Sequence, residues 1–426
     1  MNKAQELINF IEKSPTVFHV IQNVADILTA HGYKQLQQAD TFSLVPNGKY
    51  FITNNGSAII AWQMGSAAIT EGFRIIGSHS DSPGFRIKPN PEIVVQNSFI
   101  TLNTEVYGGP ILSTWFDRPL SIAGRVVLKG KEVLQPIVRL IDFKRPLLII
   151  PNLAIHMNRE VNEGYAYNRQ KDTLPLLSII DENPAKEDFL LNLIAQEADC
   201  ALSDILEFDL FLYDVQKGSI LGANNEFFSV GKIDNLGMAY ASVDALVQSA
   251  STPFTKVVCI FDNEEVGSST AQGAGSPFLS DVLNRIVQTQ GDSETFQQAL
   301  AASFLISADQ AHGTHPNYLE KNDITNFPII NRGPAIKLAA SMSYASDAVS
   351  VGVFKQVCEK ANVPCQTFVN RSDIRGGSTI GPISVRNLNI KTVDVGNPIL
   401  AMHSVRELGG VQDQESITEA FKAFYR

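Results

Sequence analysis

The amino-acid sequence predicts an α/β fold in which a mixed, mostly parallel β-sheet is sandwiched by helices and a β-rich region is inserted. Three observations support this prediction. In residues 1–89 and 221–426, apolar runs alternate with helical patterns, and these runs have the length of buried strands. Residues 90–150 carry short alternating segments separated by glycine turns, which is typical of antiparallel sheets. Several predicted strands also end on a side chain that can bind a metal ion.

Length and composition are those of a folded globular protein. The chain has 426 residues, of which 44% are hydrophobic and 18% are charged. This length exceeds one usual hydrophobic core, so two domains are expected. We predict that residues 1–89 plus 221–426 form the first domain and that residues 90–220 form a second domain inserted into it.

The charge balance and the cysteines narrow the class of protein. A formal net charge of −10 indicates neither a basic surface for nucleic acid nor a general attraction to anionic membranes. No apolar run approaches the roughly 18 residues of a membrane helix, and the N-terminus has the pattern of an amphipathic helix, not a signal peptide. The four cysteines show no CxxC spacing, which is typical of reduced thiols. We therefore expect a cytoplasmic protein without nucleic-acid or membrane partners.

The N-terminal elements come first in the chain. An amphipathic helix carrying Leu7 and Ile11 is broken at Ser14-Pro15-Thr16, which also caps a second helix over Val17–Ala30. Polar and Asn-Gly turns then separate short runs of apolar residues. These runs predict strands over Tyr50–Thr53, Ser57–Gln63 and Gly72–Ile76.

The middle of the chain has a different hydrophobic pattern, one typical of antiparallel strands. Alternating residues between glycine turns predict strands over Glu92–Val95, Phe99–Thr104, Leu120–Leu128 and Glu132–Arg139. After an apolar segment and a polar loop, the pattern predicts a helix over Ala185–Ala198 and a strand over Phe208–Val215.

From residue 225 onward, strands again alternate with helices. Apolar runs predict strands over Phe227–Val230, Val257–Phe261, Phe304–Ser307, Ala335–Leu338, Cys365–Val369 and Ile390–Val395. Helical patterns lie between them over Leu236–Ser249, Phe278–Gln290 and Ala345–Ala361, and a further helix closes the chain. This alternation favours a largely parallel sheet with helices on both faces.

Metal-binding side chains recur where these strands end. They are His79, Asp234, Glu264 with Glu265, Asp309 and, after a further segment, His403. Ligands of open α/β sheets gather outside the carboxyl ends of the strands, so residues far apart in the sequence can meet there. Two imidazoles and several carboxylates suit zinc or a similar first-row metal better than calcium or magnesium.

Charge counting separates the roles of the acids. Two divalent ions bring four positive charges, of which Asp234, Glu265 and Asp309 would neutralise three and one hydroxide the fourth. Glu264 is then left over, as a general base must be. Asp81, two residues after His79, is placed to hold the other N–H of that imidazole.

Each residue taken singly also has a purely structural interpretation. A histidine in a turn, such as His79 or His403, is most often a surface or core residue. Asp234 could cap a helix, and Asp309 could cap the segment that follows it. Glu264 and Glu265 could form a solvated loop. Their recurrence at strand ends is what favours the metal site.

At these residues the chain resembles the aspartyl aminopeptidase family of dinuclear zinc exopeptidases along nearly its whole length. The stretches that carry the resemblance are Ser78-His79-Ser80-Asp81-Ser82-Pro83, Ile233-Asp234-Asn235, Asp262-Asn263-Glu264-Glu265-Val266-Gly267-Ser268, Ser307-Ala308-Asp309-Gln310-Ala311-His312 with His315-Pro316-Asn317-Tyr318, and Ala401-Met402-His403-Ser404. Any one of them is a weak signal, but all of them in this order are a strong one.

The resemblance implies a role for each matching residue. Asp234 would bridge two zinc ions, with Co²⁺ or Mn²⁺ as substitutes. His79 and Asp309 would complete one site, and Glu265 and His403 the other. Glu264 would act as the base, and Asp81 would orient His79.

The resemblance also implies an assembly. The inserted domain would serve dimerisation, and the dimers would associate into a tetrahedral dodecamer. His156 matches a histidine that reaches the active site of the neighbouring subunit in relatives, although it could be only an interface residue. His315 matches a family histidine near the substrate carbonyl.

Substrate recognition is where the sequence departs from the family. Lys337 and Tyr344 match residues that line the first specificity pocket, whereas Arg375 stands in a turn that differs from that of eukaryotic members. Lys337 or Arg375 could pair with an acidic side chain of a peptide substrate. Some relatives prefer neutral residues, so the preferred N-terminal residue stays open.

Three other functions compete with an aminopeptidase. A dinuclear-metal carboxypeptidase or deacylase would use the same sheet. A catalytically silent assembly protein would have no need of the complete ligand set. A dinucleotide-binding enzyme is disfavoured because Gly267, Gly273 and Gly275 lack the G-x-G-x-x-G spacing.

Overall fold

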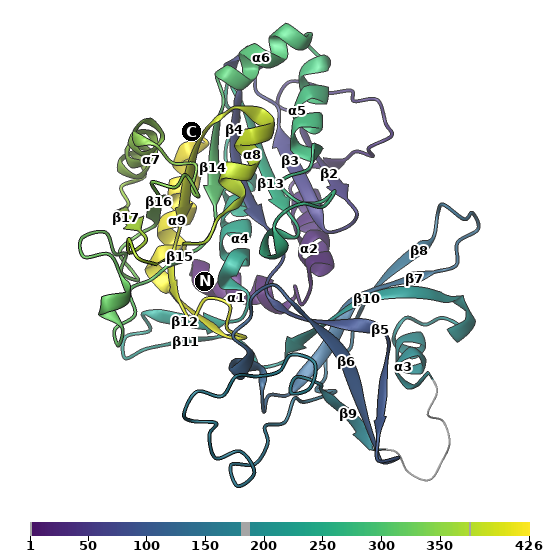
Figure 1. The fold of residues 1–426 in the computed structure, drawn as a ribbon. Helices are drawn as coiled ribbons and strands as arrows, with labels where there is room; N and C mark the ends of the chain where they lie inside the picture. Colours follow the sequence, from purple (N-terminus) through teal and green to yellow (C-terminus); the bar gives the residue numbers. More distant parts are fainter. Residues whose placement is uncertain (1, 180–187, 375) are drawn as a thin grey trace.

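The structure of the chain, a computed structural model, describes residues 2–179, 188–374 and 376–426, and these residues form three β-sheets (Figure 1). The largest has nine strands in the order β1-β2-β3-β13-β4-β14-β18-β16-β17. Its strands are β1 (Lys34–Gln35), β2 (Lys49–Asn54), β3 (Ala58–Gln63), β4 (Phe73–His79), β13 (Thr255–Phe261), β14 (Phe304–Ala308), β16 (Ala335–Leu338), β17 (Gln366–Val369) and β18 (Lys391–Gly396).

The four central strands of this sheet are parallel. Strand β4 pairs in parallel with β13 and with β14, and β14 pairs in parallel with β18. Strands β3 and β16 flank this group and run antiparallel to their central neighbours. The predicted mixed, mostly parallel sheet is therefore confirmed, and four strands present their carboxyl ends at one edge.

Helices cover both faces of the nine-stranded sheet (Figure 1). Successive residues of β13 alternate between two apolar clusters: Val258 and Ile260 belong to one, and Val257 and Cys259 to the other. One cluster packs against α1 (Lys3–Glu12), α2 (Val17–Ala30), α4 (Ile233–Gln248), α7 (Ala348–Ala361) and α9 (Val411–Phe424). The other packs against α5 (Phe278–Gln288), α6 (Ser293–Ala301) and α8 (Ile380–Leu388). Burial on both faces explains why these strands are continuous apolar runs.

A six-stranded antiparallel sheet, in the order β8-β7-β10-β5-β6-β9, forms a second body beside the first (Figure 1). Its elements are β5 (Gly84–Val95), β6 (Phe99–Tyr107), β7 (Leu120–Leu128), β8 (Ile137–Asp142), β9 (Leu176–Ile179), α3 (Phe189–Glu197) and β10 (Ile205–Asp214). It has its own apolar core, to which Phe85, Ile122 and Leu210 belong. The division into residues 1–89 plus 221–426 and an inserted 90–220 domain stays a prediction.

Several predicted bounds in this region differ from the structure. Strand β5 begins at Gly84, so the segment Glu92–Val95 is only its end. The strand predicted from Glu132 begins at Ile137, because Pro136 cannot donate a ladder hydrogen bond and residues 131–134 turn. The helix predicted from Ala185 begins, within the described part of the chain, at Phe189, and residues 185–187 lie outside that part.

A five-stranded sheet was not predicted. Its order is β11-β12-β20-β19-β15, and its strands are β11 (Ser219–Leu221), β12 (Phe227–Val230), β15 (Ala311–His312), β19 (Pro398–Leu400) and β20 (Glu407–Gly410). Strand β12 had been expected among the strands of the main sheet but pairs here with β11 and β20. Within the described residues, no helix combines the length and the apolar character that crossing a membrane requires.

Candidate metal centre

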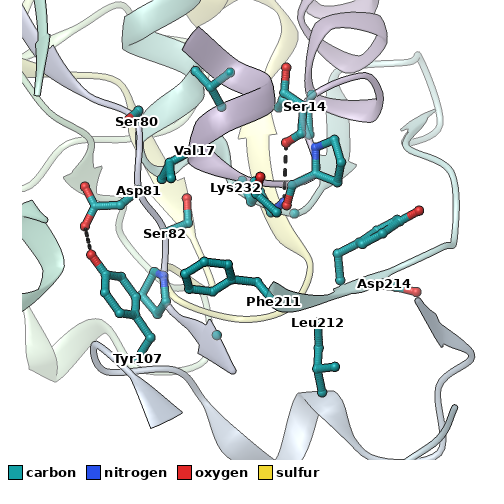
Figure 2. Close-up of a pocket in the computed structure, with 18 of the residues that line it drawn as sticks. Ser14, Val17, Ser80, Asp81, Ser82, Tyr107, Phe211, Leu212, Asp214 and Lys232 are labelled. Carbon is teal, nitrogen blue, oxygen red and sulfur yellow. Dashed lines mark hydrogen bonds between the residues drawn. The ribbon is translucent and has the colours of Figure 1, made fainter. Parts of the chain in front are cut away.

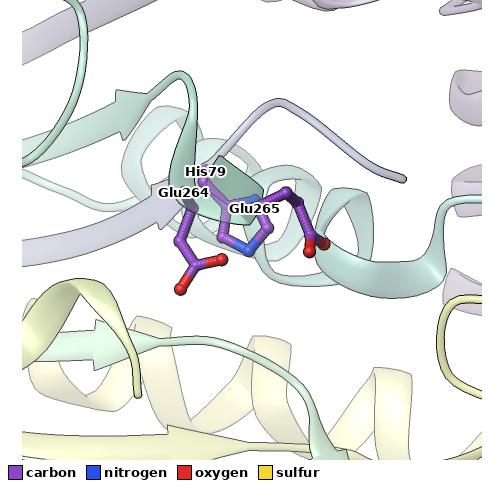
Figure 3. A group of neighbouring side chains, drawn as sticks. All are labelled: His79, Glu264 and Glu265. Atoms are coloured by element: carbon purple, nitrogen blue, oxygen red, sulfur yellow. The ribbon is translucent and has the colours of Figure 1, made fainter. Parts of the chain in front are cut away.

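Three predicted site segments meet at the carboxyl edge of the central strands. His79 is the last residue of β4 and pairs in register with Phe261, the last residue of β13. The chain then turns through a short 3-10 helix that carries Glu264 and Glu265. Asp309 directly follows the neighbouring strand β14. Figure 3 shows the side chain of His79 between those of Glu264 and Glu265.

The other two predicted ligands arrive from the five-stranded sheet. Asp234 lies in the first turn of α4, just after β12, and the peptide bond between Asp234 and Asn235 is cis. His403 lies in the loop between β19 and β20. Because β12 pairs with β20, with Val230 opposite Glu407, this sheet holds both residues against the edge of the larger one.

Asp234 lies between two groups of potential ligands. Its Oδ1 atom is 3.5 Å from His79 Nε2, which is also 3.5 Å from Asp309 Oδ1. Its Oδ2 atom is 3.6 Å from His403 Nε2, which is 3.4 Å from Glu265 Oε2. In each group of three residues the ligand atoms lie within 4.8 Å of one another. Two of the groups that could hold an ion therefore share the Asp234 carboxylate, and a third consists of His79, Glu264 and Glu265.

Both histidines have their other ring nitrogen engaged. His79 Nδ1 lies 3.1 Å from the backbone oxygen of Asp81 and 3.3 Å from its Oδ1 atom. His403 Nδ1 lies 3.1 Å from the backbone oxygen of Gly109. Such contacts hold a metal-binding imidazole in orientation and leave Nε2 free for the ion. Asp81 therefore lies beside His79, and its orienting role stays a prediction.

Burial and neighbouring charges shift the pKa values of the acidic side chains in the site. Burial, aided by the charges of Asp309 and Asp234 and opposed by His79, raises the pKa of Glu264 to about 8. Burial, together with Asp234, also raises the pKa of Glu265 well above its usual range. Asp234 is buried too, but its contacts with His403 and His79 hold its pKa low.

Two buried carboxylate oxygens of the site indicate that it binds a cation. Glu265 Oε1 is buried and has no hydrogen-bond partner among the described residues, and Asp234 Oδ1, also buried without one, has only the His79 imidazole at 3.5 Å. Buried charged oxygens are normally paired or bound to a metal ion. Because the donors are two imidazoles and three carboxylates, the residues fit zinc.

A pocket of about 320 Å³ opens beside the two groups. Its lining includes the acids and His403 together with Lys337, Tyr344, Phe368, His312 and Thr379. Lys337 is almost fully buried, donates to the backbone oxygen of Gln310 at 2.8 Å, and lies 3.4 Å from Asp309 Oδ2. Burial opposes its charge, but Asp309 and other neighbours raise its pKa, so Lys337 remains a cation.

Two of the other predicted substrate residues, His156 and His315, lie outside the described lining of this pocket. His156 is exposed in an irregular segment. His315 lies against Tyr318 with the two rings tilted and 4.9 Å between their centroids. Neither is among the described lining residues, and Arg375 lies outside the described part of the chain.

Sequence reasoning missed residues that complete the site. Glu407 is buried and accepts hydrogen bonds from the backbone N–H groups of Asp234, at 3.0 Å, and His403, at 2.8 Å. The Tyr107 hydroxyl donates to Asp81 Oδ2 at 2.7 Å. For Glu407 the only available signal was its spacing of four residues from His403, and for Tyr107 there was none.

Comparison with known proteins places these features in a family. The family described as Aminopeptidase I zinc metalloprotease (M18) matches residues 10–425. The "Probable M18 family aminopeptidase 2" of Clostridium novyi (strain NT) is 54% identical over 424 residues, which cover 99% of this chain and 98% of that protein.

Solved structures agree with this assignment. A cryo-EM structure of the Ape4 and Nbr1 complex has a TM-score of 0.95 and 36% identity, covering 99% of this chain and 85% of that one. The S. cerevisiae mApe1 dodecamer has a TM-score of 0.85 and 27% identity, covering 99% and 96%. The resemblance to the aspartyl aminopeptidase type is thereby confirmed, and the chain belongs to the M18 family of zinc metalloproteases of the aminopeptidase kind.

Proposed function

We propose that this protein is a dinuclear zinc aminopeptidase that removes the N-terminal residue of peptides. The observation that carries the proposal is the position of Asp234 between two groups of ligands, beside a pocket that also contains Glu264. His79, Asp234 and Asp309 would hold one ion, and Asp234, Glu265 and His403 the other. Zinc supplies Lewis-acid chemistry, since it lowers the pKa of water and polarises carbonyl groups.

Glu264 is proposed as the general base. It belongs to neither of the two groups that share Asp234, although it lies close to His79 and Glu265. Its backbone N–H donates to Asp81 Oδ1 at 3.1 Å, and that of Glu265 donates to Asp81 Oδ2 at 3.1 Å. Asp81 thus sets the direction of both glutamates. The Glu264 carboxylate would take a proton from the attacking water and pass it to the leaving amine.

Peptides with a free N-terminus are the expected substrates. An acetyl group on that amine should reduce kcat/KM by more than about 100-fold, because the blocked nitrogen can no longer pair with the acidic groups of the site. The measurement compares matched free and acetylated peptides under zinc, cobalt and manganese. Efficient cleavage of the acetylated peptide would instead indicate a deacylase or carboxypeptidase.

We further propose that the pocket prefers acidic N-terminal residues, because Lys337 places a buried cation in its wall. Lys337→Met should lower kcat/KM for N-terminal Asp or Glu by about 10- to 100-fold, the value of one charge-assisted hydrogen bond, with a much smaller effect on N-terminal Leu or Ala. Zinc content must be measured in parallel, since Lys337 also contacts Asp309. An equal loss for acidic and neutral substrates, with metal retained, would contradict the acidic preference.

We propose a homo-oligomeric, cytoplasmic enzyme in which residues 90–220 serve dimerisation and the dimers form a dodecamer. This proposal is supported by a similar structure, which is that of a dodecamer. Exposed apolar side chains such as Val133, Leu134 and Val138 lie on or before β8, at the edge of the six-stranded sheet. In such an assembly, His156 would reach the active site of a neighbouring subunit, and His315 would approach the substrate carbonyl.

A further inference from the structure

We propose that Tyr107, at the end of β6 in the six-stranded sheet, is a positioning residue for the metal centre. Its hydroxyl holds Asp81, which in turn orients His79 and the two glutamates. The proposal rests on the metal-binding function proposed above. It gives the six-stranded sheet a part in metal binding within the same chain, apart from any part in assembly.

The contacts of Asp81 carry the argument. This carboxylate is buried, lies 3.3 Å from His79 Nδ1, and accepts hydrogen bonds from the backbone N–H groups of Glu264 and Glu265. Tyr107 donates a third hydrogen bond, to Oδ2, at 2.7 Å. Figure 2 shows the Tyr107 ring with its hydroxyl directed at Asp81. The two backbone N–H donors belong to the turn that carries Glu264 and Glu265. Tyr107 is therefore the donor that comes from the six-stranded sheet.

Tyr107 also forms a hydrogen bond with the turn that carries Glu264 and Glu265. Its hydroxyl oxygen accepts a hydrogen bond from Asn263 Nδ2 at 3.0 Å, and Asn263 Oδ1 accepts one from Thr270 Oγ1 at 2.8 Å. Asn263 adopts a left-handed backbone conformation, with φ of 60°, immediately before Glu264. One hydroxyl therefore contacts both the orienting acid and the residue at which the chain turns toward its ligands.

The residues that follow Tyr107 contact the second histidine. The backbone oxygen of Gly109 lies 3.1 Å from His403 Nδ1, and the backbone N–H of Ile111 donates to the backbone oxygen of His403 at 2.9 Å. Gly108, with φ of 66°, leaves room for Glu265, because a Cβ atom there would lie 3.2 Å from that of Glu265. Residues 107–111, the last of β6 and the four that follow it, thus contact His403 directly and His79 through Asp81.

Packing alone does not hold Asp81 in place. Asp81 and Tyr107 line a cavity of about 270 Å³ between α2 and strands β5 and β10, so one side of the pair is not filled by protein atoms (Figure 2). Without the Tyr107 hydroxyl, the Asp81 carboxylate would lose one hydrogen bond and could move toward the cavity. Partners that orient a metal-binding imidazole typically contribute about 10- to 100-fold in metal affinity.

The test replaces Tyr107 by phenylalanine, which removes only the hydroxyl. Tyr213→Phe is the matched control, since Tyr213 also comes from the six-stranded sheet and donates to a carboxylate, Asp142 Oδ1, at 2.5 Å, which is neither a proposed ligand nor Asp81. Zinc affinity is measured by competition with a chromophoric chelator, and the visible spectrum of the cobalt-substituted protein reports ligand geometry. Thermal unfolding in excess chelator reports the fold without the ion.

Tyr107→Phe should bind zinc about tenfold more weakly than wild type and should change the cobalt spectrum, whereas Tyr213→Phe should do neither. In excess chelator the two variants should unfold at similar temperatures. Wild-type affinity and spectrum in Tyr107→Phe, or the same loss in Tyr213→Phe, would overturn the positioning role while leaving the metal site intact. A wild-type chain that binds no zinc would overturn the proposed function as well.

Discussion

Glu264→Gln should abolish nearly all turnover while leaving the metal content and the fold unchanged. The glutamine keeps the size of the side chain but cannot accept a proton, and general acid–base catalysis typically contributes about 10²- to 10⁴-fold. That range corresponds to roughly 3 to 5 kcal/mol of the activation free energy. Glu264 is not needed to complete either group that shares Asp234, so zinc should stay bound. Steady-state kinetics with metal analysis of the same sample checks both parts.

Glu163→Gln is the matched control for this variant, because it makes the same chemical change at an exposed position. It should retain wild-type kcat. The role of Glu264 as base would be excluded if its glutamine variant, with metal bound, kept more than a few per cent of wild-type activity. A variant that lost zinc would indicate instead that Glu264 is a ligand.

Asp234→Ala should remove metal from both sites at once. Asp234 is the only residue common to the two groups that contain His403 and Asp309, so its loss takes one oxygen ligand from each. Loss of a direct ligand should cost more than the roughly 100-fold in affinity that an outer partner contributes. Metal analysis should fall from about two ions per chain toward none, and activity should disappear with it.

Asp244→Ala provides the control on the same helix. Asp244 lies in α4, ten residues beyond Asp234, and pairs with Lys3 at 3.1 Å, away from the ligands. It should retain metal and activity. Circular dichroism should show that both variants are folded. Two ions per chain in folded Asp234→Ala would contradict the shared carboxylate, and one ion would indicate that Asp234 serves a single site.

The sequence predicted the central strands because burial on both faces makes them continuous apolar runs. It also predicted where three candidate ligands lie, since His79 ends β4, Asp309 directly follows β14, and Glu265 lies in the short helix after β13. Parallel pairing of β13, β4 and β14 then brings these ends to one edge. For this part of the site, periodicity and placement were sufficient.

The sequence patterns did not predict two helices of the structure, α8 and α6. Helix α8 contains Pro382 in its first turn and follows two glycines, so its sequence has the pattern of a turn. Proline is tolerated there because its missing N–H would have no partner within the helix. Helix α6 did have a signal, since Asp292 accepts a hydrogen bond from the backbone N–H of Thr295 as its N-cap.

By itself, the sequence predicted the central strands of the main sheet and named the candidate metal-binding side chains, because local burial and residue chemistry depend on short stretches of chain. Only the tertiary structure placed Asp234 and His403, which come from a sheet whose strands of two to four residues are too short to show a period. Likewise, only the tertiary structure brought Tyr107 to Asp81 and Gly109 to His403. Contacts between separate sheets depend on how whole surfaces pack, and no local pattern in the chain encodes them.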